Sequence, residues 1–236
     1  MAHITEKFFD SKEALTAELS ASLEQSLVSG IKNDGRAVLM VSGGSSPAPA
    51  YKHLSNLELD WDNIDVAMVD ERWVDVEHEK SNEAFIKGTL LQNHGAAANF
   101  ITMKNAAETA EQGSKECEKA YQQLKQAFDV TILGMGPDGH TASLFPHAQG
   151  LEQGLTTSQL VCAINAIESD VTGTITERMT LTLSAIAQSK VVKLLISGEE
   201  KLAVYKAAKA GGDVDDMPLR AVLNHPTINI EVYWAP

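Results

Sequence analysis

Short apolar runs recur along this chain of 236 residues, and each stops abruptly at a loop of glycine, serine or charged residues. Ala37–Val41 (AVLMV) stops at Ser42–Pro47, and Val130–Leu133 (VTIL) stops at Gly134–Gly139. Continuous apolar runs of this length, bounded by glycine and proline, are typical of strands that are covered on both faces. Because such runs alternate with helical patterns, the chain is expected to form a layered α/β fold.

The segments between these runs fit the same alternation. Leucines spaced four apart from Leu15 to Leu27 predict an amphipathic helix that ends at Gly30, and Asp10 with Glu13 has the spacing of its capping box. Further strands are predicted at Val66–Val69, Asn99–Met103, Leu160–Ile164, Arg178–Leu183, Val191–Ile196 and Ile228–Trp234. Further helices are predicted at Pro47–Leu54, Ser81–Leu91, Ala106–Phe128, Ser184–Gln188, Glu199–Lys209 and Pro218–Leu223. We therefore predict one domain over residues 1–236, with helices on both faces of a mainly parallel, open sheet in three layers.

The overall charge limits the partners that the chain is expected to bind. Its formal net charge is −13, whereas nucleic acids and anionic membranes select basic surfaces. No run approaches the roughly 20 apolar residues of a membrane span, and the first residues lack a signal-peptide pattern. Cys117 and Cys162 are far apart and not in a metal-binding spacing. We expect a cytoplasmic protein with reduced thiols that binds neither nucleic acid nor membranes.

The loop after Ala37–Val41 has the outline of a phosphate-binding turn. Gly43, Gly44 and Ser45 separate a strand from a helix whose first turn contains Pro47. Backbone N–H groups at such a helix start are unpaired and attract anions. The segment is neither a GxxxxGK[ST] nor a GxGxxG motif, and an ordinary turn without a ligand stays an open alternative.

Three other strand ends carry charged side chains. Asp70 and Arg72 follow one predicted strand, Asp138 and His140 follow a second, and Lys201 lies in the first helical turn after a third. In an open parallel sheet, ligands bind beyond the carboxyl ends of the strands. Two alternatives stay open: a solvated loop with an ion pair from Arg72 to Asp70 or Glu71, and a solvated lysine at position 201.

If these strand ends share one crevice, it combines a base with groups that bind anions. A histidine, with an ordinary pKa of about 6.5, is suited to take a proton from water when a carboxylate orients it. Arginine, lysine and a helix start suit a phosphate. The combination predicts an enzyme that acts on a small phosphorylated molecule by proton transfer or hydrolysis.

Two other chemistries fit less well. Ser143 lies near His140, but the segment lacks the GxSxG pattern of a nucleophile elbow, so a covalent serine mechanism is not expected. A metal site formed by Asp138, His140 and His147 lacks HExxH or a related spacing. We therefore predict no metal site.

Several ordered motifs together resemble a known family. GMGPDGHTASLFP at Gly134–Pro146, VSGGSSP at Val41–Pro47 and DERWV at Asp70–Val74 are similar to motifs of the 6-phosphogluconolactonase family, within the glucosamine-6-phosphate isomerase/deaminase-like superfamily. Arg178–Leu181 and Gly198–Lys201 match two further blocks in the expected order. The resemblance covers essentially the whole chain.

This resemblance implies a modified Rossmann-like fold without a cofactor, and hydrolysis of 6-phospho-D-glucono-1,5-lactone in the pentose phosphate pathway. His140 would be the general base, and Asp138 and Asp70 would orient or polarise it. Phosphate and oxyanion binding would fall to a cationic and backbone set, listed as Gly43, Gly44, Ser45, Arg72, Arg178 and Lys201. The expected partner is thus a small phosphorylated sugar lactone, bound by a monomer or weak homo-oligomer.

Two rival functions remain within the same outline. Related deaminases and isomerases have a glutamate where this chain has Phe145, and that loss favours a hydrolase. A non-catalytic sugar-phosphate sensor would bind without turnover, but His140 is intact and no helix-turn-helix segment is appended. Departures from the family pattern at His147–Ala148 and Pro218–Ala221 affect the expected loop shape and fine specificity.

Overall fold

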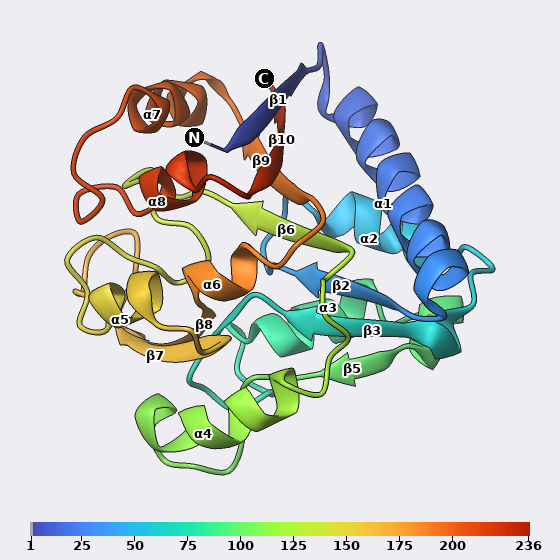
Figure 1. The fold of residues 1–236 in the computed structure, drawn as a ribbon, viewed down its shortest axis with the longest axis horizontal. Coiled ribbons are helices and arrows are strands. Elements are labelled where there is room, and N and C mark those ends of the chain that lie inside the picture. The colour runs from blue at the N-terminus through green and yellow to red at the C-terminus, as the bar shows by residue number, and fades with distance from the viewer. Residues whose placement is uncertain (1) are drawn as a thin grey trace.

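A seven-stranded parallel sheet forms the centre of the computed structural model, which describes residues 2–236 (Figure 1). Its strands are β1 (His3–Phe8), β2 (Ala37–Val41), β3 (Ile64–Met68), β5 (Asn99–Ile101), β6 (Val130–Gly134), β9 (Val192–Ser197) and β10 (Asn229–Ala235). They lie in the order β1-β10-β9-β6-β2-β3-β5, and every neighbouring pair is parallel. The predicted mainly parallel sheet is confirmed.

Helices cover both faces of this sheet. Because both faces are covered, all five residues of the strand β2 are apolar. Leu39 and Val41 pack in a cluster with the buried leucines of α1 (Lys12–Asp34) and with α2 (Ala48–Ser55) and α3 (Asn82–Thr89). Val38 and Met40 belong to the cluster on the other face. That cluster includes residues of α4 (Ala110–Tyr121), α5 (Leu151–Thr156), α6 (Leu183–Ile186), α7 (Glu199–Lys209) and α8 (Leu219–Asn224). The predicted three-layer arrangement is therefore confirmed.

A second, smaller sheet lies beside the first and was not predicted. It is antiparallel, in the order β4-β8-β7, and consists of β4 (Asp70–Arg72), β7 (Val161–Asn165) and β8 (Glu177–Leu181). The interpretation of Asp70–Arg72 as a loop was wrong, because the segment pairs with β8 and sets Arg72 opposite Arg178. Three polar residues have no apolar pattern, so only their distant pairing partner identifies them as a strand.

Several element boundaries also differ from the prediction. Ser11, not Asp10, caps α1 by accepting a 3.1 Å hydrogen bond from the N–H of Ala14, and α1 continues past Gly30 to Asp34. The predicted helix at Ala106–Phe128 was too long, since α4 spans Ala110–Tyr121. The strand β1 and the helix α5 were missed. β1 lies at an edge of the sheet and is largely exposed, so it lacks a buried-strand pattern.

Short 3₁₀ turns at Trp61–Asn63 and Asn93–Ala97 precede β3 and β5.

Within residues 2–236 no helix has the length and apolar character needed to cross a membrane. The four central strands β9, β6, β2 and β3 are neighbours, so the loops that follow them converge at one edge of the sheet.

Candidate active site

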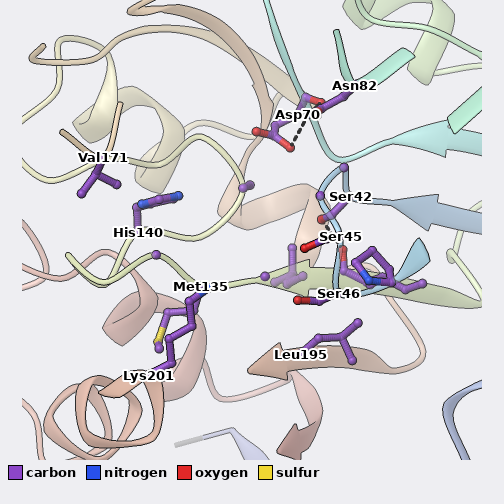
Figure 2. A pocket seen from close by; sticks show the side chains of 18 of the residues that line it. Ser42, Ser45, Ser46, Asp70, Asn82, Met135, His140, Val171, Leu195 and Lys201 are labelled. Carbon is purple, nitrogen blue, oxygen red and sulfur yellow. Dashed lines mark hydrogen bonds between the residues drawn. The ribbon is translucent and has the colours of Figure 1, made fainter. Parts of the chain in front are cut away.

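The loops that follow these four strands enclose a cavity of about 680 Å³ (Figure 2). Seven of the predicted site residues line it: Gly43, Gly44, Ser45, Asp70, Arg72, His140 and Lys201. In the close-up, the serines of the β2 loop lie across the cavity from His140, with Asp70 and Asn82 at one end and Lys201 at the other. The sheet thus brings together residues that are far apart in the sequence.

The loop between β2 and α2 forms one wall of the cavity. Gly44 has a φ of 96°, a conformation that favours glycine, and Gly43 passes so close to Asn82 that a Cβ atom would lie 2.1 Å from its Oδ1. Among the hydrogen bonds within residues 2–236, the backbone N–H groups of Gly44, Ser45 and Ser46 have no acceptor. These donors and the N-terminus of α2 are suited to an anion in the cavity.

His140 lines the opposite wall and is paired with Asp138, which is not among the lining residues. The Nδ1 atom of His140 lies 2.6 Å from Oδ1 of Asp138, and the same oxygen accepts the backbone N–H of His140 at 3.1 Å. Burial raises the pKa of the Asp138 carboxyl, but the hydrogen bonds and charge of His140 outweigh this and leave it below its ordinary value. An ionised Asp138 accepts only, so Nδ1 carries the proton and Nε2 is left as the acceptor.

The loop around this pair fixes the orientation of the imidazole. The N–H of Gly136 donates to the carbonyl of His140 at 3.0 Å, and Gly139, with a φ of 78°, continues the turn. The ring of Phe145 lies 4.2 Å from the imidazole, centroid to centroid. The side chain of His140 is therefore held by a carboxylate at one edge and by an aromatic ring on its face.

Asp70 lies at the start of β4 and is held by two neutral donors. Its Oδ2 accepts a 2.7 Å hydrogen bond from the Oγ–H of Ser143, and its backbone carbonyl accepts a 3.0 Å bond from Nδ2 of Asn82. Ser143 is fully buried. The serine that resembled a nucleophile in the sequence is thus a hydrogen-bond donor to Asp70.

Arg72 extends into the same end of the cavity. Its Nη1 donates to Oδ1 of Asn82 and to the carbonyl of Lys80, each at 3.2 Å. The sequence left open an ion pair from Arg72 to Asp70 or Glu71. The structure differs, because the Glu71 carboxylate accepts backbone N–H groups, including that of Arg72 at 2.8 Å. Arg72 and Asn82 form one polar wall.

Arg178 does not line the cavity. Its guanidinium is buried, donates to the carbonyls of Thr172 and Ile175 at 3.0 Å, and lies 5.4 Å from the centre of the Phe145 ring. Burial, together with the nearby charge of Arg72, lowers its pKa to about 10. Arg178 thus holds the loop between β7 and β8.

Two residues of this loop line the cavity and were missed in the sequence. Asp170 and Val171 face it from the β7–β8 connection, and Figure 2 shows Val171 beside His140. The loop follows a strand of the second sheet, so the rule for the carboxyl edge of the parallel sheet did not point to it. No local signal in the sequence distinguishes these residues from an ordinary surface loop.

The three residues that were weighed as metal ligands are not grouped in the structure. The Nε2 atom of His147 lies 3.2 Å from Oδ1 of Asp216, and both side chains are more than half exposed. Within residues 2–236, no group of three or more His, Cys, Asp or Glu residues has the arrangement of a metal site.

Comparisons with known proteins agree with this architecture. The family model described as glucosamine-6-phosphate isomerases/6-phosphogluconolactonase matches residues 10–234. A 6-phosphogluconolactonase from Rhizobium meliloti (strain 1021) is 37% identical over 97% of this chain and 97% of its own. One from Pseudomonas putida is 36% identical over 95% of this chain and 90% of its own. The crystal structure of a 6-phosphogluconolactonase from Shewanella baltica OS155 is 37% identical and superimposes with a TM-score of 0.93, covering 100% of this chain and 98% of that one.

Proposed function

The chain belongs to the glucosamine-6-phosphate isomerase/6-phosphogluconolactonase family, and we propose that it hydrolyses 6-phospho-D-glucono-1,5-lactone to 6-phospho-D-gluconate, with His140 as general base. The observation that carries the proposal is the 2.6 Å contact between His140 Nδ1 and Asp138 Oδ1 in a cavity whose other walls suit a phosphate. The reaction is a step of the oxidative pentose phosphate pathway.

The proposed reaction begins with a water molecule between Nε2 of His140 and the lactone carbonyl. Nε2 takes a proton from the water as its oxygen bonds to the carbonyl carbon, and Asp138 stabilises the imidazolium that forms. The carbonyl oxygen becomes an oxyanion. When the tetrahedral intermediate collapses, the bond from the carbonyl carbon to the ring oxygen breaks, and His140 returns its proton to that oxygen. The product acid then ionises and releases one proton.

The remaining cavity residues are assigned to the charged parts of the substrate. The free N–H groups of Gly44 and Ser45, together with Gly43, Arg72 and Lys201, would bind the phosphate and stabilise the oxyanion. Asp70 would orient or polarise the reacting groups from the other side. We assign Arg178 an indirect role, because its Nε and Nη2 groups donate to loop carbonyls.

Phe145 supports hydrolysis over the isomerase or deaminase reaction. It occupies the position of the glutamate of the related deaminases and isomerases, and its buried ring packs against the imidazole of His140. Opening a sugar ring and moving a proton between carbons uses a second acid or base, which Phe145 cannot supply. Hydrolysis of a lactone needs only activated water and a stabilised oxyanion.

Proton release tests the proposal directly. Freshly made 6-phosphogluconolactone is added to wild-type protein and to His140→Ala in a pH-stat, and acid production is compared with the spontaneous reaction. We expect rapid release by wild type and a rate at least about 100-fold lower for a folded His140→Ala protein. A wild-type rate equal to the spontaneous rate would refute the lactonase function. Tight binding of 6-phosphogluconate without turnover would then favour a sensor.

A further inference from the structure

Glu71 is a fully buried carboxylate that does not line the cavity, yet it is surrounded by hydrogen-bond donors. Its Oε1 accepts the backbone N–H groups of Arg72 and Asn82, both at 2.8 Å. Its Oε2 accepts the N–H of Glu83 at 2.7 Å and the Oγ–H of Ser81 at 3.2 Å. Both carboxylate oxygens are therefore saturated by donors from two segments of the chain.

These bonds join β4 to the N-terminus of α3. The N–H groups of Asn82 and Glu83 belong to the first turn of α3, where a negative charge is stabilised by the helix dipole. The N–H of Arg72 belongs to β4. Glu71 thus sets the distance and orientation between a strand and a helix that contact each other beside the cavity.

The two residues that Glu71 holds by their main chains also touch each other through their side chains. Nη1 of Arg72 donates to Oδ1 of Asn82 at 3.2 Å, and Nδ2 of Asn82 donates to the Asp70 carbonyl at 3.0 Å. Both side chains line the cavity. A shift of α3 relative to β4 would therefore misalign the guanidinium that faces the substrate.

We propose that Glu71 is a positioning residue, whose carboxylate locks the Arg72–Asn82 pair in the geometry that binds the phosphate of the substrate. This inference rests on the proposed function for the identity of that phosphate. It assigns a task to the one residue of the DER segment that has no contact with the cavity.

The chemistry of the four contacts requires an acceptor-only group. Burial raises the pKa of Glu71 to about 7, while the backbone N–H donors of Asn82 and Glu83 act in the opposite direction and stabilise the ionised form. A glutamine of nearly the same shape would place its own N–H₂ group against one pair of these donors. Because the Ser81 hydroxyl can also accept, Glu71→Gln removes at least one backbone N–H contact without creating a cavity.

The test compares Glu71→Gln with a matched control, Glu118→Gln. Glu118 is also a buried carboxylate that accepts two backbone N–H groups, those of Leu160 and Val161, at 2.8 and 3.0 Å, but it is remote from the cavity lining. Binding of inorganic phosphate and 6-phosphogluconate is measured by calorimetry above pH 7, where Glu71 is ionised. We expect Glu71→Gln to weaken both by roughly tenfold, equivalent to about 1.4 kcal/mol, and Glu118→Gln to leave both unchanged.

Kinetics separate positioning from a general loss of stability. With the phosphorylated lactone, Glu71→Gln should raise KM by roughly tenfold with a kcat within about threefold of wild type, since His140 and Asp138 are undisturbed. A milder variant, Glu71→Asp, keeps the charge, and its KM is expected to lie between those of wild type and Glu71→Gln. It provides the test if Glu71→Gln does not fold.

Equal phosphate affinities of Glu71→Gln and Glu118→Gln, or a fall in kcat alone, would overturn the inference. The amide resonances of Asn82 and Glu83 provide a second readout, because loss of a charged acceptor shifts them in the NMR spectrum. If wild type does not hydrolyse the lactone but its phosphate affinity still depends on Glu71, the proposed function fails and the positioning role stands.

Discussion

The hydroxyl of Ser143 donates a 2.7 Å hydrogen bond to Oδ2 of Asp70, and it joins the loop after β6 to the first residue of β4. The same serine receives support from β8, because its backbone N–H donates to Oγ1 of Thr180 at 3.0 Å. All of Ser143 is buried. This contact couples the loop that holds His140 to the sheet that holds Asp70 and Arg72.

Replacing Ser143 by alanine is expected to slow the enzyme without abolishing its activity. The loss of one hydrogen bond to a charged group, with little change of volume, should lower kcat/KM for the lactone by roughly 10- to 100-fold. Steady-state kinetics in the pH-stat measure this, with circular dichroism as the control for folding. A rate that drops to the spontaneous reaction would instead support a nucleophilic serine.

Gly136 leaves room for the catalytic pair, so its substitution should affect chemistry more than stability. A Cβ atom there would lie 2.1 Å from Nδ1 and Cε1 of His140 and 2.6 Å from Oδ1 of Asp138. We expect Gly136→Ala to displace the imidazole and lower kcat by roughly 100-fold. Gly88→Ala, which adds a methyl group in open space on α3, is the control and should keep full activity. Normal turnover by Gly136→Ala would contradict the proposed role of the pair.

Arg178 anchors the β7–β8 loop, and removal of its side chain should loosen that loop. Arg178→Ala leaves the carbonyls of Thr172 and Ile175 without their donor, so cleavage of the loop by a protease should accelerate and KM should rise. Limited proteolysis with mass spectrometry locates the cut. If the loop stays resistant while inorganic phosphate no longer binds, Arg178 contacts the ligand itself.

Asp65 and Arg36 form a bidentate pair at the start of β2 and β3, and this pair should make stability depend on pH. Burial raises the pKa of Asp65, but the hydrogen bonds from Arg36 and Asn99 outweigh it and leave the pKa below 3.8. The stabilisation is therefore complete above pH 3.8 and is lost as the pH falls through the lower folded-state value.

Asp65→Asn tests that relationship by removing the charge. We expect the variant to lose about 1–2 kcal/mol of unfolding free energy at neutral pH, because Arg36 is partly exposed and solvent screens the pair. The difference from wild type should shrink in strongly acidic buffer. Urea titrations at several pH values measure this difference in unfolding free energy. A difference that grew on acidification would contradict the expected direction of the pH dependence.

Much of the sheet was predictable from local patterns alone. The runs at Ala37–Val41 and Val130–Leu133 are continuous apolar segments with glycine at their ends, and each became a central strand. The helix at Glu199–Lys209 was predicted at its observed bounds. In contrast, β1 and β4 have few buried apolar residues, so propensity and periodicity could not identify them.

Most of the residues expected at the cavity followed from one general rule, that parallel strands place their carboxyl ends together. This rule brought Gly43–Ser45, His140 and Lys201 to a single cavity. It did not apply to Arg178 or to Asp170, which belong to the antiparallel sheet and its loop. Arg178 was expected only through the family resemblance of Arg178–Leu181, and no local pattern in the sequence pointed to Asp170.

Local sequence patterns were enough to predict the buried apolar strands, the glycines that end them, and the charged groups at those ends, because these properties depend on neighbours along the chain. Three roles became visible only in the folded molecule: Ser143 donates to Asp70, Arg178 donates to loop carbonyls, and Glu71 joins β4 to α3. Each of these depends on which distant segments pack together, since a buried polar group must find its partner wherever the fold places one.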